Sequence, residues 1–273
     1  MNQPRRAGVL GRPIAHSLSP VLHRAAYREL GLAWRYDAID CGVQELAATL
    51  RDRAHWAGFS CTMPLKHAAL ELADEVRPNA HAAGAANTLL PMAGGGWAAD
   101  NTDVTGVVAA LGERRPAPLT ATVLGAGGTA QAVVVALYEL GLRRCVVAVR
   151  DQRRATGLLE TAAGVGVEVT LTALGVDSAS LAADLVVSTL PSGAADPLAG
   201  RAWSAGQTVF DVSYDPWPTA LSTAAAKAGA TVICGRELLL HQAAAQVELM
   251  TGRPAPLEAM RSALAAAAPA AAP

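Results

Sequence analysis

Cysteine is scarce in this sequence, and so is charge of either sign in excess. The 273 residues include four cysteines, Cys41, Cys61, Cys145 and Cys234, with no Cys-x-x-Cys pair and no histidine at metal-ligand spacing. No metal site is therefore expected, and the thiols are predicted to be free and buried in a reducing cytoplasm. The 22 basic residues oppose 23 acidic ones, which leaves a net charge of −1. Binding to nucleic acid has no electrostatic support.

Aromatic residues and long apolar runs are also few. Aromatics make up 4% of a chain that is 52% hydrophobic, so closely packed, alanine-rich helices and sheets are expected. No run reaches transmembrane length, and the apolar stretch after the N-terminal arginines is too short for a secretion signal, which predicts a cytoplasmic protein with no membrane partner. The length suits two domains, and the chain is expected to be a monomer or a homodimer.

Alternating strand and helix patterns predict an α/β fold with two domains. Through about residue 103, apolar runs alternate with helix-period segments at Pro20–Leu30 and Val43–Arg53, and two further strands flank a glycine turn at Gly94–Gly96. This part is predicted to be an α/β substrate domain with a mixed sheet. A helix from Thr102 to Gly112 follows.

The second half begins with a strand, a glycine turn and a helix, and five more strands follow. This rhythm predicts a parallel, Rossmann-like sheet that binds NADP. Two helices, Glu237 to about Thr251 and Pro256–Ala267, are expected to pack back on the first domain. The predicted boundaries are 1–103 with 236–273 for the substrate-binding and catalytic domain, and 104–235 for the NADP domain.

Two serines, Ser17 and Ser19, lie at the junction between the first strand and its helix. Residues i and i+2 of an extended segment point to the same side, so both hydroxyls could bind one carboxylate. In the other interpretation, Ser19 caps the helix whose first residue is Pro20.

A glycine fingerprint of the form G-x-G-x-x-A lies between the first strand and first helix of the second half, where it indicates a dinucleotide site. The glycines allow a tight turn and a close approach to the pyrophosphate, and the small last residue allows close helix-strand packing. The predicted cofactor-binding residues of this turn are Gly125, Ala126, Gly127, Gly128, Thr129 and Ala130.

The end of the next strand favours NADP over NAD. Arg150 stands where an NAD site usually has an acidic residue, and Arg154 follows one turn later. Both guanidinium groups could bind a 2′-phosphate. Asp151 keeps the NAD alternative open, because its carboxylate could accept a hydrogen bond from a ribose hydroxyl.

Four polar segments follow predicted strand ends in the first half. Each has a plain structural explanation: Lys66 could be a solvated helix residue, Asn87 a turn residue, and Asp103 an acid at a helix N-terminus. Their order is more informative. The segments are His16-Ser-Leu-Ser-Pro20, Thr62-Met-Pro-Leu-Lys66, Gly84-Ala-Ala-Asn-Thr88 and Asn101-Thr-Asp103, followed by the glycine fingerprint, Asp211-Val-Ser-Tyr214 and Gly235-Arg-Glu-Leu-Leu-Leu-His-Gln242.

This order resembles the shikimate dehydrogenase family from Gly11 to about Gly252. The resemblance implies NADPH-dependent reduction of 3-dehydroshikimate to shikimate, a step of aromatic amino acid biosynthesis. It assigns carboxylate binding to Ser17 and Ser19, catalysis to Lys66 and Asp103, and binding of the ring hydroxyls to Thr62, Asn87, Asp103 and Gln242. It also places Tyr214 over the substrate, and Thr189 and Gly235 beside the cofactor.

The residue types suit ketone reduction, because the developing alkoxide needs a cation or a proton donor in a site shielded from water. Lys66 could be the proton carrier or an electrostatic clamp, with Asp103 holding it in place. Several residues depart from the family pattern: Ser60 and Arg24 each stand where asparagine is usual, and Ser188 stands where alanine is usual. Asp151 also departs from the usual motif on the adenosine side.

Three alternatives remain open. A quinate/shikimate or aminoshikimate dehydrogenase that uses NAD or NADP would retain the chemistry on a different ring. A non-catalytic NADP-binding sensor would retain only the nucleotide site, which the presence of both Lys66 and Asp103 disfavours. A folate dehydrogenase with a catalytic lysine is disfavoured by the serine loop, since a pterin offers no matching small carboxylate.

Overall fold

The computed structural model describes residues 4–53, 55–113, 119–175 and 179–267, which fold into two compact α/β units. One unit takes in the chain up to Gly106 and again from Leu239, and the other runs from Val107 to Leu238. The predicted class, with one mixed and one parallel sheet, is confirmed. None of the helices in the described ranges combines the length and hydropathy that crossing a membrane requires.

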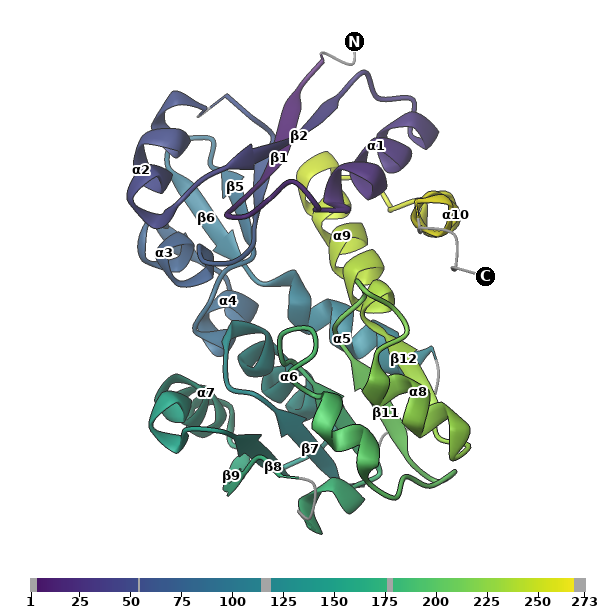
Figure 1. The fold of residues 1–273 in the computed structure, drawn as a ribbon. Helices are drawn as coiled ribbons and strands as arrows, with labels where there is room; N and C mark the ends of the chain where they lie inside the picture. Colours follow the sequence, from purple (N-terminus) through teal and green to yellow (C-terminus); the bar gives the residue numbers. More distant parts are fainter. Residues whose placement is uncertain (1–3, 54, 114–118, 176–178, 268–273) are drawn as a thin grey trace. The chain divides into compact units, whose positions relative to one another are not determined.

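The sheet of the first unit is mixed (Figure 1). Its strands are β1 (Arg6–Gly11), β2 (Arg35–Asp40), β3 (Gly58–Cys61), β4 (Glu75–Val76), β5 (Thr88–Pro91) and β6 (Trp97–Asp100). They lie in the order β2-β1-β3-β5-β6-β4, with β1 parallel to β2 and β3, and β5 antiparallel to β3 and β6. The expected hairpin joins β5 and β6. The pattern analysis missed β4, because two residues are too few to show an alternation.

The helices of this unit follow its strands. They are α1 (Ser19–Glu29), α2 (Val43–Asp52), α3 (Lys66–Glu71), α4 (Pro78–Ala83), the start of α5 (Thr102–Gly112), most of α9 (Gly235–Thr251), and α10 (Leu257–Ala266). Apolar residues of α1, α9 and α10 share one core cluster, which includes Leu22, Leu240 and Met260. The predicted packing of the closing helices on the first part of the chain is therefore confirmed.

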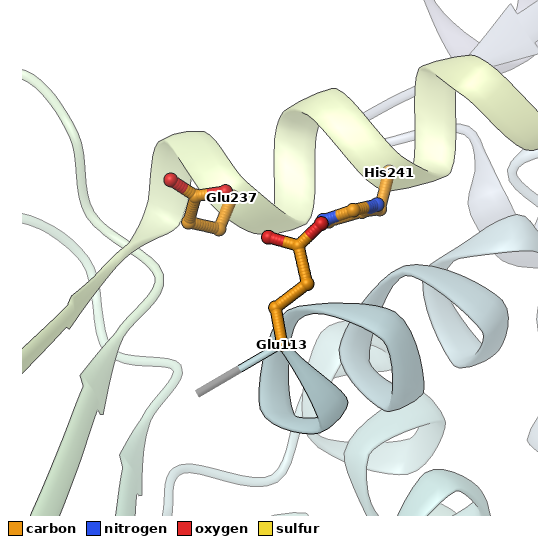
Figure 2. Close-up of side chains that lie close together, drawn as sticks. All are labelled: Glu113, Glu237 and His241. Carbon is orange, nitrogen blue, oxygen red and sulfur yellow. The ribbon is translucent and has the colours of Figure 1, made fainter. Parts of the chain in front are cut away.

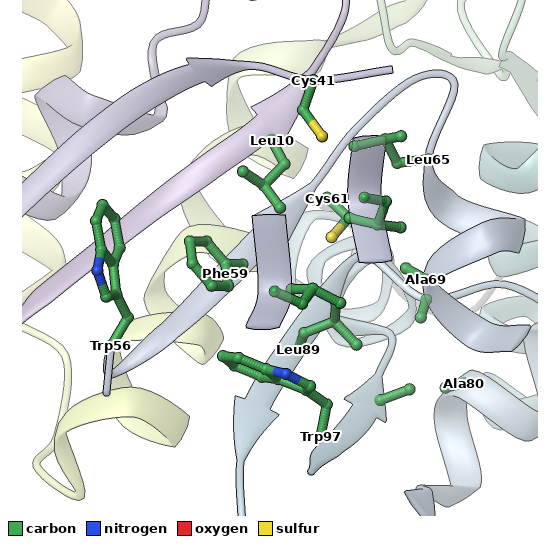
Figure 3. Close-up of a cluster of buried hydrophobic side chains, with 14 residues drawn as sticks. Leu10, Cys41, Trp56, Phe59, Cys61, Leu65, Ala69, Ala80, Leu89 and Trp97 are labelled. Carbon is green, nitrogen blue, oxygen red and sulfur yellow. The ribbon is translucent and has the colours of Figure 1, made fainter. Parts of the chain in front are cut away.

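A second core cluster lies on the other face of the same sheet (Figure 3). Phe59 of β3 lies between two tryptophans, with its ring 5.2 Å from that of Trp56 and 5.4 Å from that of Trp97. Cys61 and Leu65 continue the cluster toward α3. Three of the chain's few aromatic residues thus lie under the strands that carry the polar segments.

The second unit is built on a fully parallel sheet. Its strands are β7 (Ala121–Leu124), β8 (Arg144–Val149), β9 (Glu168–Ala173), β10 (Leu185–Ser188), β11 (Thr208–Asp211) and β12 (Thr231–Cys234), in the order β12-β11-β10-β7-β8-β9. Its helices include α6 (Gly128–Glu139), α7 (Thr156–Val165) and α8 (Ala220–Lys227), with short 3₁₀ turns η1 (Gln152–Ala155), η2 (Ala179–Ala182) and η3 (Asp196–Gly200). All residues of β7, β10 and β11 are buried, as expected for a parallel sheet covered on both faces.

Candidate active site

The topology of the mixed sheet brings the predicted polar segments to one edge. The carboxyl ends of the parallel strands β1 and β3 lie together, and Thr62 follows β3. Because β5 is antiparallel to β3 and to β6, its first residue, Thr88, pairs with both Ser60 and Asp100. Asn87 before β5 and Asp103 after β6 therefore reach the same edge as Thr62.

Lys66 and Asp103 form an ion pair at this edge. Lys66 is the first residue of α3, and its Nζ lies 2.5 Å from Oδ2 of Asp103, the second residue of α5. Their side chains are only 18% and 9% exposed, so water screens the pair weakly. The helix dipole favours a carboxylate in the first turn of α5. The buried side chain of Asn101 also accepts a hydrogen bond from the backbone N–H of Asp103, which fixes the start of the helix.

Asn87 holds the other oxygen of Asp103. Its Nδ2 donates to Asp103 Oδ1 at 2.8 Å and to Thr102 Oγ1 at 3.0 Å, and it lies 3.5 Å from Gln242 Oε1. Its Oδ1 accepts from Thr88 Oγ1 and from the Thr102 backbone N–H, both at 2.8 Å. Four predicted residues, Lys66, Asn87, Asp103 and Gln242, thus come together in one hydrogen-bonded group.

The serine loop has a different local structure from the extended segment expected. Ser17 N–H donates to Ile14 O at 3.0 Å in a turn, and Leu18 has right-handed helical backbone angles, because α1 already begins at Ser19. Ser19 makes no side-chain cap, so the capping interpretation is also wrong. Its backbone N–H donates to Ser17 Oγ at 3.4 Å, which keeps the two serines close together.

Thr62 lies beside the start of this serine loop. Its N–H donates to Leu10 O at 2.9 Å, and the N–H of Arg12 donates to Met63 O at 3.0 Å. These bonds join the segments that follow β1 and β3. Thr62 directly follows β3 and is half-buried, and Ser19 begins the helix that follows β1 and is buried.

The second unit contains a pocket of about 740 Å³ at the carboxyl ends of its strands. It opens where the strand order reverses between β7 and β10, which is the usual ligand site of such sheets. Its lining residues are Gly125, Ala126, Gly127, Val149, Arg150, Asp151, Arg154, Thr189, Leu190 and Pro191. Its volume is within the range of small-molecule sites.

The glycine turn in this pocket has the geometry that a dinucleotide needs. Gly125 has a φ of +103°, a backbone conformation that residues with a side chain rarely adopt. A Cβ there would also lie 2.7 Å from Thr189 Oγ1, so both the conformation and the available space require glycine. A Cβ on Gly127 would meet no atom within 4 Å, which leaves its backbone open to a ligand. Gly128 and Thr129 form the first turn of α6, and Ala130 is fully buried against the sheet.

The arginines after β8 differ in what they contact. Asp151 accepts two hydrogen bonds from the Arg153 guanidinium, at 3.0 and 3.1 Å, and also caps η1. These bonds lower the pKa of Asp151 and commit its carboxylate to Arg153. Arg150 and Arg154 line the pocket and make no ion pair within the described residues. The residues present therefore fit a nucleotide that carries a phosphate on its adenosine ribose.

The remaining predicted cofactor residues have clear structural positions. Thr189 lines the pocket and donates to Leu124 O at 2.8 Å. Gly235, the first residue of α9, does not line this pocket. A Cβ there would lie 1.9 Å from Val212 O, which gives this glycine a packing role. Tyr214 follows β11, and burial raises the pKa of its hydroxyl.

Glu113, Glu237 and His241 are drawn in Figure 2. Glu237 and His241 lie one turn apart on α9, and Glu113 follows the last residue of α5. Carboxylate oxygens of Glu113 and Glu237 lie within 4.8 Å of each other. Acidic side chains often gather in this way without an ion, so this group supports no metal assignment.

Sequence reasoning missed several buried polar residues behind the site, including Thr88, Ser60 and Gln246. In the sequence, Thr88 stands out only as part of a motif, and Ser60 only as a departure from the family pattern. Gln246 had one available signal: it lies four residues after Gln242 on the same helix and so points to the same side. The four cysteines are free, and Cys41, Cys61 and Cys145 are buried.

One unit has a parallel sheet with a glycine turn and an arginine-lined pocket, and the other has a mostly buried lysine–aspartate pair. Together these features define a two-unit dehydrogenase that binds a dinucleotide. The sequence matches the family described as shikimate dehydrogenase substrate binding domain over residues 9–89, and the shikimate 5'-dehydrogenase C-terminal domain over residues 235–265. The chain belongs to the shikimate dehydrogenase family.

Individual relatives with names from this family match nearly the whole chain. A Synechococcus protein named shikimate dehydrogenase (NADP(+)) is 36% identical over 94% of this chain and 93% of its own length. The crystal structure of Mycobacterium tuberculosis shikimate dehydrogenase superposes with a TM-score of 0.86 at 48% identity, covering 96% of this chain and all of that one. Quinate dehydrogenase from Corynebacterium glutamicum in complex with NAD has a TM-score of 0.85 at 31% identity, over 97% of this chain and 100% of that one.

Proposed function

We propose that this protein is an NADP-dependent shikimate dehydrogenase, which reversibly reduces 3-dehydroshikimate to shikimate in the route to chorismate and the aromatic amino acids. The observation that carries the proposal is the Lys66–Asp103 pair, in which Asn87 holds the free oxygen of Asp103. The named relatives support the same activity. A cytoplasmic location and a monomeric or homodimeric state remain predictions.

The substrate is proposed to bind to residues 1–103 with 236–273. In this assignment Ser17 and Ser19 bind the carboxylate, while Thr62, Asn87, Asp103 and Gln242 bind the ring hydroxyls. The serine pair supports it, because two hydroxyls from a turn and a helix start offer donors to one small anion. Tyr214 is proposed to close over the substrate.

Lys66 is proposed to act on the substrate oxygen that changes oxidation state. Its ammonium stabilises the developing alkoxide and donates the proton in the direction of reduction. Asp103 orients the ammonium through Oδ2 and remains an acceptor for the neighbouring ring hydroxyl. Because both side chains are mostly buried, the pair acts in surroundings where its electrostatic effect is stronger than in water.

NADP is proposed to bind to residues 104–235. Gly125, Gly127 and the start of α6 would hold the pyrophosphate, and Arg150 and Arg154 the 2′-phosphate. When bound, the cofactor supplies the hydride or accepts it. Thr189 is proposed to lie on the nicotinamide side of the pocket.

Lys66→Met tests the catalytic assignment, and the chain offers a matched control because its only other lysine is the exposed Lys227. We expect kcat for shikimate oxidation with NADP to fall about 100- to 1000-fold in Lys66→Met, as for loss of an oxyanion partner. Lys227→Met should retain the activity of the original protein. Reduced cofactor is followed by absorbance, and circular dichroism checks folding.

Near-normal turnover in folded Lys66→Met would refute the catalytic role of this lysine. If the unmodified protein binds NADP but never reduces it with shikimate, a non-catalytic NADP sensor becomes the better interpretation. These two outcomes separate a wrong residue from a wrong function.

A second candidate is a quinate/shikimate dehydrogenase that uses NAD. It is favoured by Asp151 on the pocket lining and by the likeness to the quinate dehydrogenase in complex with NAD. The engagement of Asp151 with Arg153 favours the first proposal instead. Values of kcat/KM for shikimate and quinate with each cofactor separate the two, and a higher value for quinate with NAD would select the second.

A further inference from the structure

A chain of buried polar side chains continues from Asp103 into the first unit, on the side away from Lys66. Its members after Asp103 are Asn87, Thr88, Gln246, Ser60 and Tyr36, none of which is more than 5% exposed. Such groups are costly to bury unless each donor meets an acceptor. The contacts show that this requirement is met at every step.

The directions of the hydrogen bonds are determined at the Gln246 amide oxygen, which can only accept. Ser60 Oγ lies 2.6 Å from this oxygen and therefore donates to it. Ser60 must then accept from the Tyr36 hydroxyl, 2.5 Å away. His23 Nε2 lies 3.3 Å from the same oxygen, and burial lowers the pKa of this histidine to about 3, so a neutral ring donates here.

The Gln246 amide nitrogen determines the directions of the remaining hydrogen bonds, toward Asn87. One of its hydrogens goes to Asn87 O at 3.1 Å, and the other to Thr88 Oγ1 at 2.9 Å. The Thr88 hydroxyl consequently donates its own hydrogen to Asn87 Oδ1, 2.8 Å away. With its oxygen held by this hydroxyl and by the Thr102 backbone N–H, the Asn87 side-chain amide directs Nδ2 at Asp103. A flipped amide would place two donors together at Thr88 and two acceptors together at Asp103.

We propose that Gln246 is a positioning residue, which acts through Thr88 to fix the orientation of the Asn87 amide and, through it, the carboxylate that pairs with Lys66. The inference builds on the proposed function, because Asn87 and Asp103 are the groups assigned there to the substrate. Gln246 is fully buried and hydrogen-bonds to groups behind the site, so its effect on the reaction is indirect.

Arg24 and Ser60, which both stand where asparagine is usual in the family, contact Tyr36 at the far end of this series of hydrogen bonds. The Arg24 guanidinium donates twice to Tyr36 O, at 3.0 and 2.7 Å, and Ser60 accepts from the Tyr36 hydroxyl. His23 stacks on the Tyr36 ring with centroids 3.9 Å apart. The Tyr36 hydroxyl donates to Ser60 Oγ, and the Ser60 hydroxyl donates its single hydrogen to Gln246 Oε1.

The test replaces the relay hydroxyl while keeping side-chain shape. Thr88→Val removes the donor to Asn87, Thr88→Ser retains it, and Thr251→Val removes a hydroxyl from the far end of α9 as a matched control. We expect Thr88→Val and Gln246→Met each to lower kcat/KM for shikimate about tenfold, the effect of losing one buried hydrogen bond to a group in the site. Thr88→Ser and Thr251→Val should stay within about twofold of the original protein.

A double variant, Thr88→Val with Gln246→Met, separates a relay from two independent effects. If both residues act on Asn87 in series, the double variant should lose about as much as either single one. Losses that multiply would overturn the proposal. Unchanged kcat/KM in folded Thr88→Val and Gln246→Met would also overturn it, as would an equal loss in Thr251→Val.

The proposed function is tested separately from the role of Gln246. The unmodified protein is assayed first with shikimate and NADP, and the absence of turnover there refutes the function itself. Urea unfolding of each variant shows how much stability has changed, and only variants that are fully folded under assay conditions enter the comparison.

Discussion

At the scale of single residues, the site depends on how many neighbours hold each group. Asp103 is held at its backbone by Asn101 and at its two oxygens by Asn87 and Lys66. Each bond restricts the carboxylate, and Asn87 and Asn101 are themselves buried. The same surroundings that orient a polar group also penalise a charge on it, as His23 shows.

His23 is expected to make the protein less stable at mildly acidic pH. Its pKa is about 3 in the folded protein because burial disfavours the charged ring, whereas an unfolded histidine has a pKa of about 6.5. Between these values the unfolded chain binds one proton more, so the free energy of unfolding falls as the pH falls. From pH 7 to pH 5 this loss should be about 2 kcal/mol.

Urea unfolding at both pH values measures this effect. His23→Phe retains a ring against Tyr36 but cannot be protonated, and it should lose less stability over this pH step than the original protein does. His55→Phe alters an exposed histidine and should behave like the original. The same pH dependence in all three proteins would show that other groups are responsible.

At the scale of elements, the most informative segment is the end of β8 with η1. Asp151 caps η1 and pairs with Arg153, which leaves Arg150 and Arg154 on the pocket without an ion-pair partner in the described part of the chain. A short turn thereby separates one arginine with a structural role from two that face the nucleotide site. Cofactor preference should depend on the latter.

Arg150→Gln should raise KM for NADP about 10- to 100-fold, the usual effect of losing a charge-assisted hydrogen bond, while KM for NAD changes little. Steady-state kinetics with both cofactors measure this. Arg144→Gln, at the other end of β8 and exposed, is the control. Equal losses with NADP and NAD would mean that Arg150 does not recognise the 2′-phosphate.

At the scale of the whole molecule, the chain distributes its predicted ligand residues over two units. The serine loop and the Lys66–Asp103 pair belong to one unit, and the glycine pocket belongs to the other. Each unit has its own sheet and its own core. Binding of the two ligands should therefore be separable by mutation.

Replacing Ser17 and Ser19 together by alanine should abolish stabilisation by shikimate and leave stabilisation by NADP intact. A ligand at 100 times its dissociation constant stabilises the folded state by about 2.7 kcal/mol, so thermal unfolding with each ligand can report the difference. Arg150→Gln should show the reverse pattern. Loss of both responses in either variant would contradict this division of the ligand sites.

Much of the fold could be predicted because its signals are local. The bounds of α5 and the glycine turn before α6 follow from glycine and helix-start chemistry within a few residues. The serine loop was mispredicted for the same reason: alternation assumes an extended backbone, whereas Leu18 and Ser19 already turn into α1. The two-residue β4 left no pattern to read.

Part of the candidate site could be predicted from the amino-acid sequence, and part is determined only by the tertiary structure. The glycine turn and the arginines after β8 could be identified from the sequence, because residue type and short-range geometry suffice for such features. The catalytic assignment of Lys66 and Asp103 came only from the resemblance to the family, since each residue taken singly has a plain structural explanation. The role of Gln246 could not be identified from the sequence. It meets Asn87 across 159 positions and Ser60 across 186. Strand order and the packing of α9 determine these two contacts of Gln246. No local sequence pattern encodes such contacts, because they depend on the burial of apolar faces that are far apart in the chain.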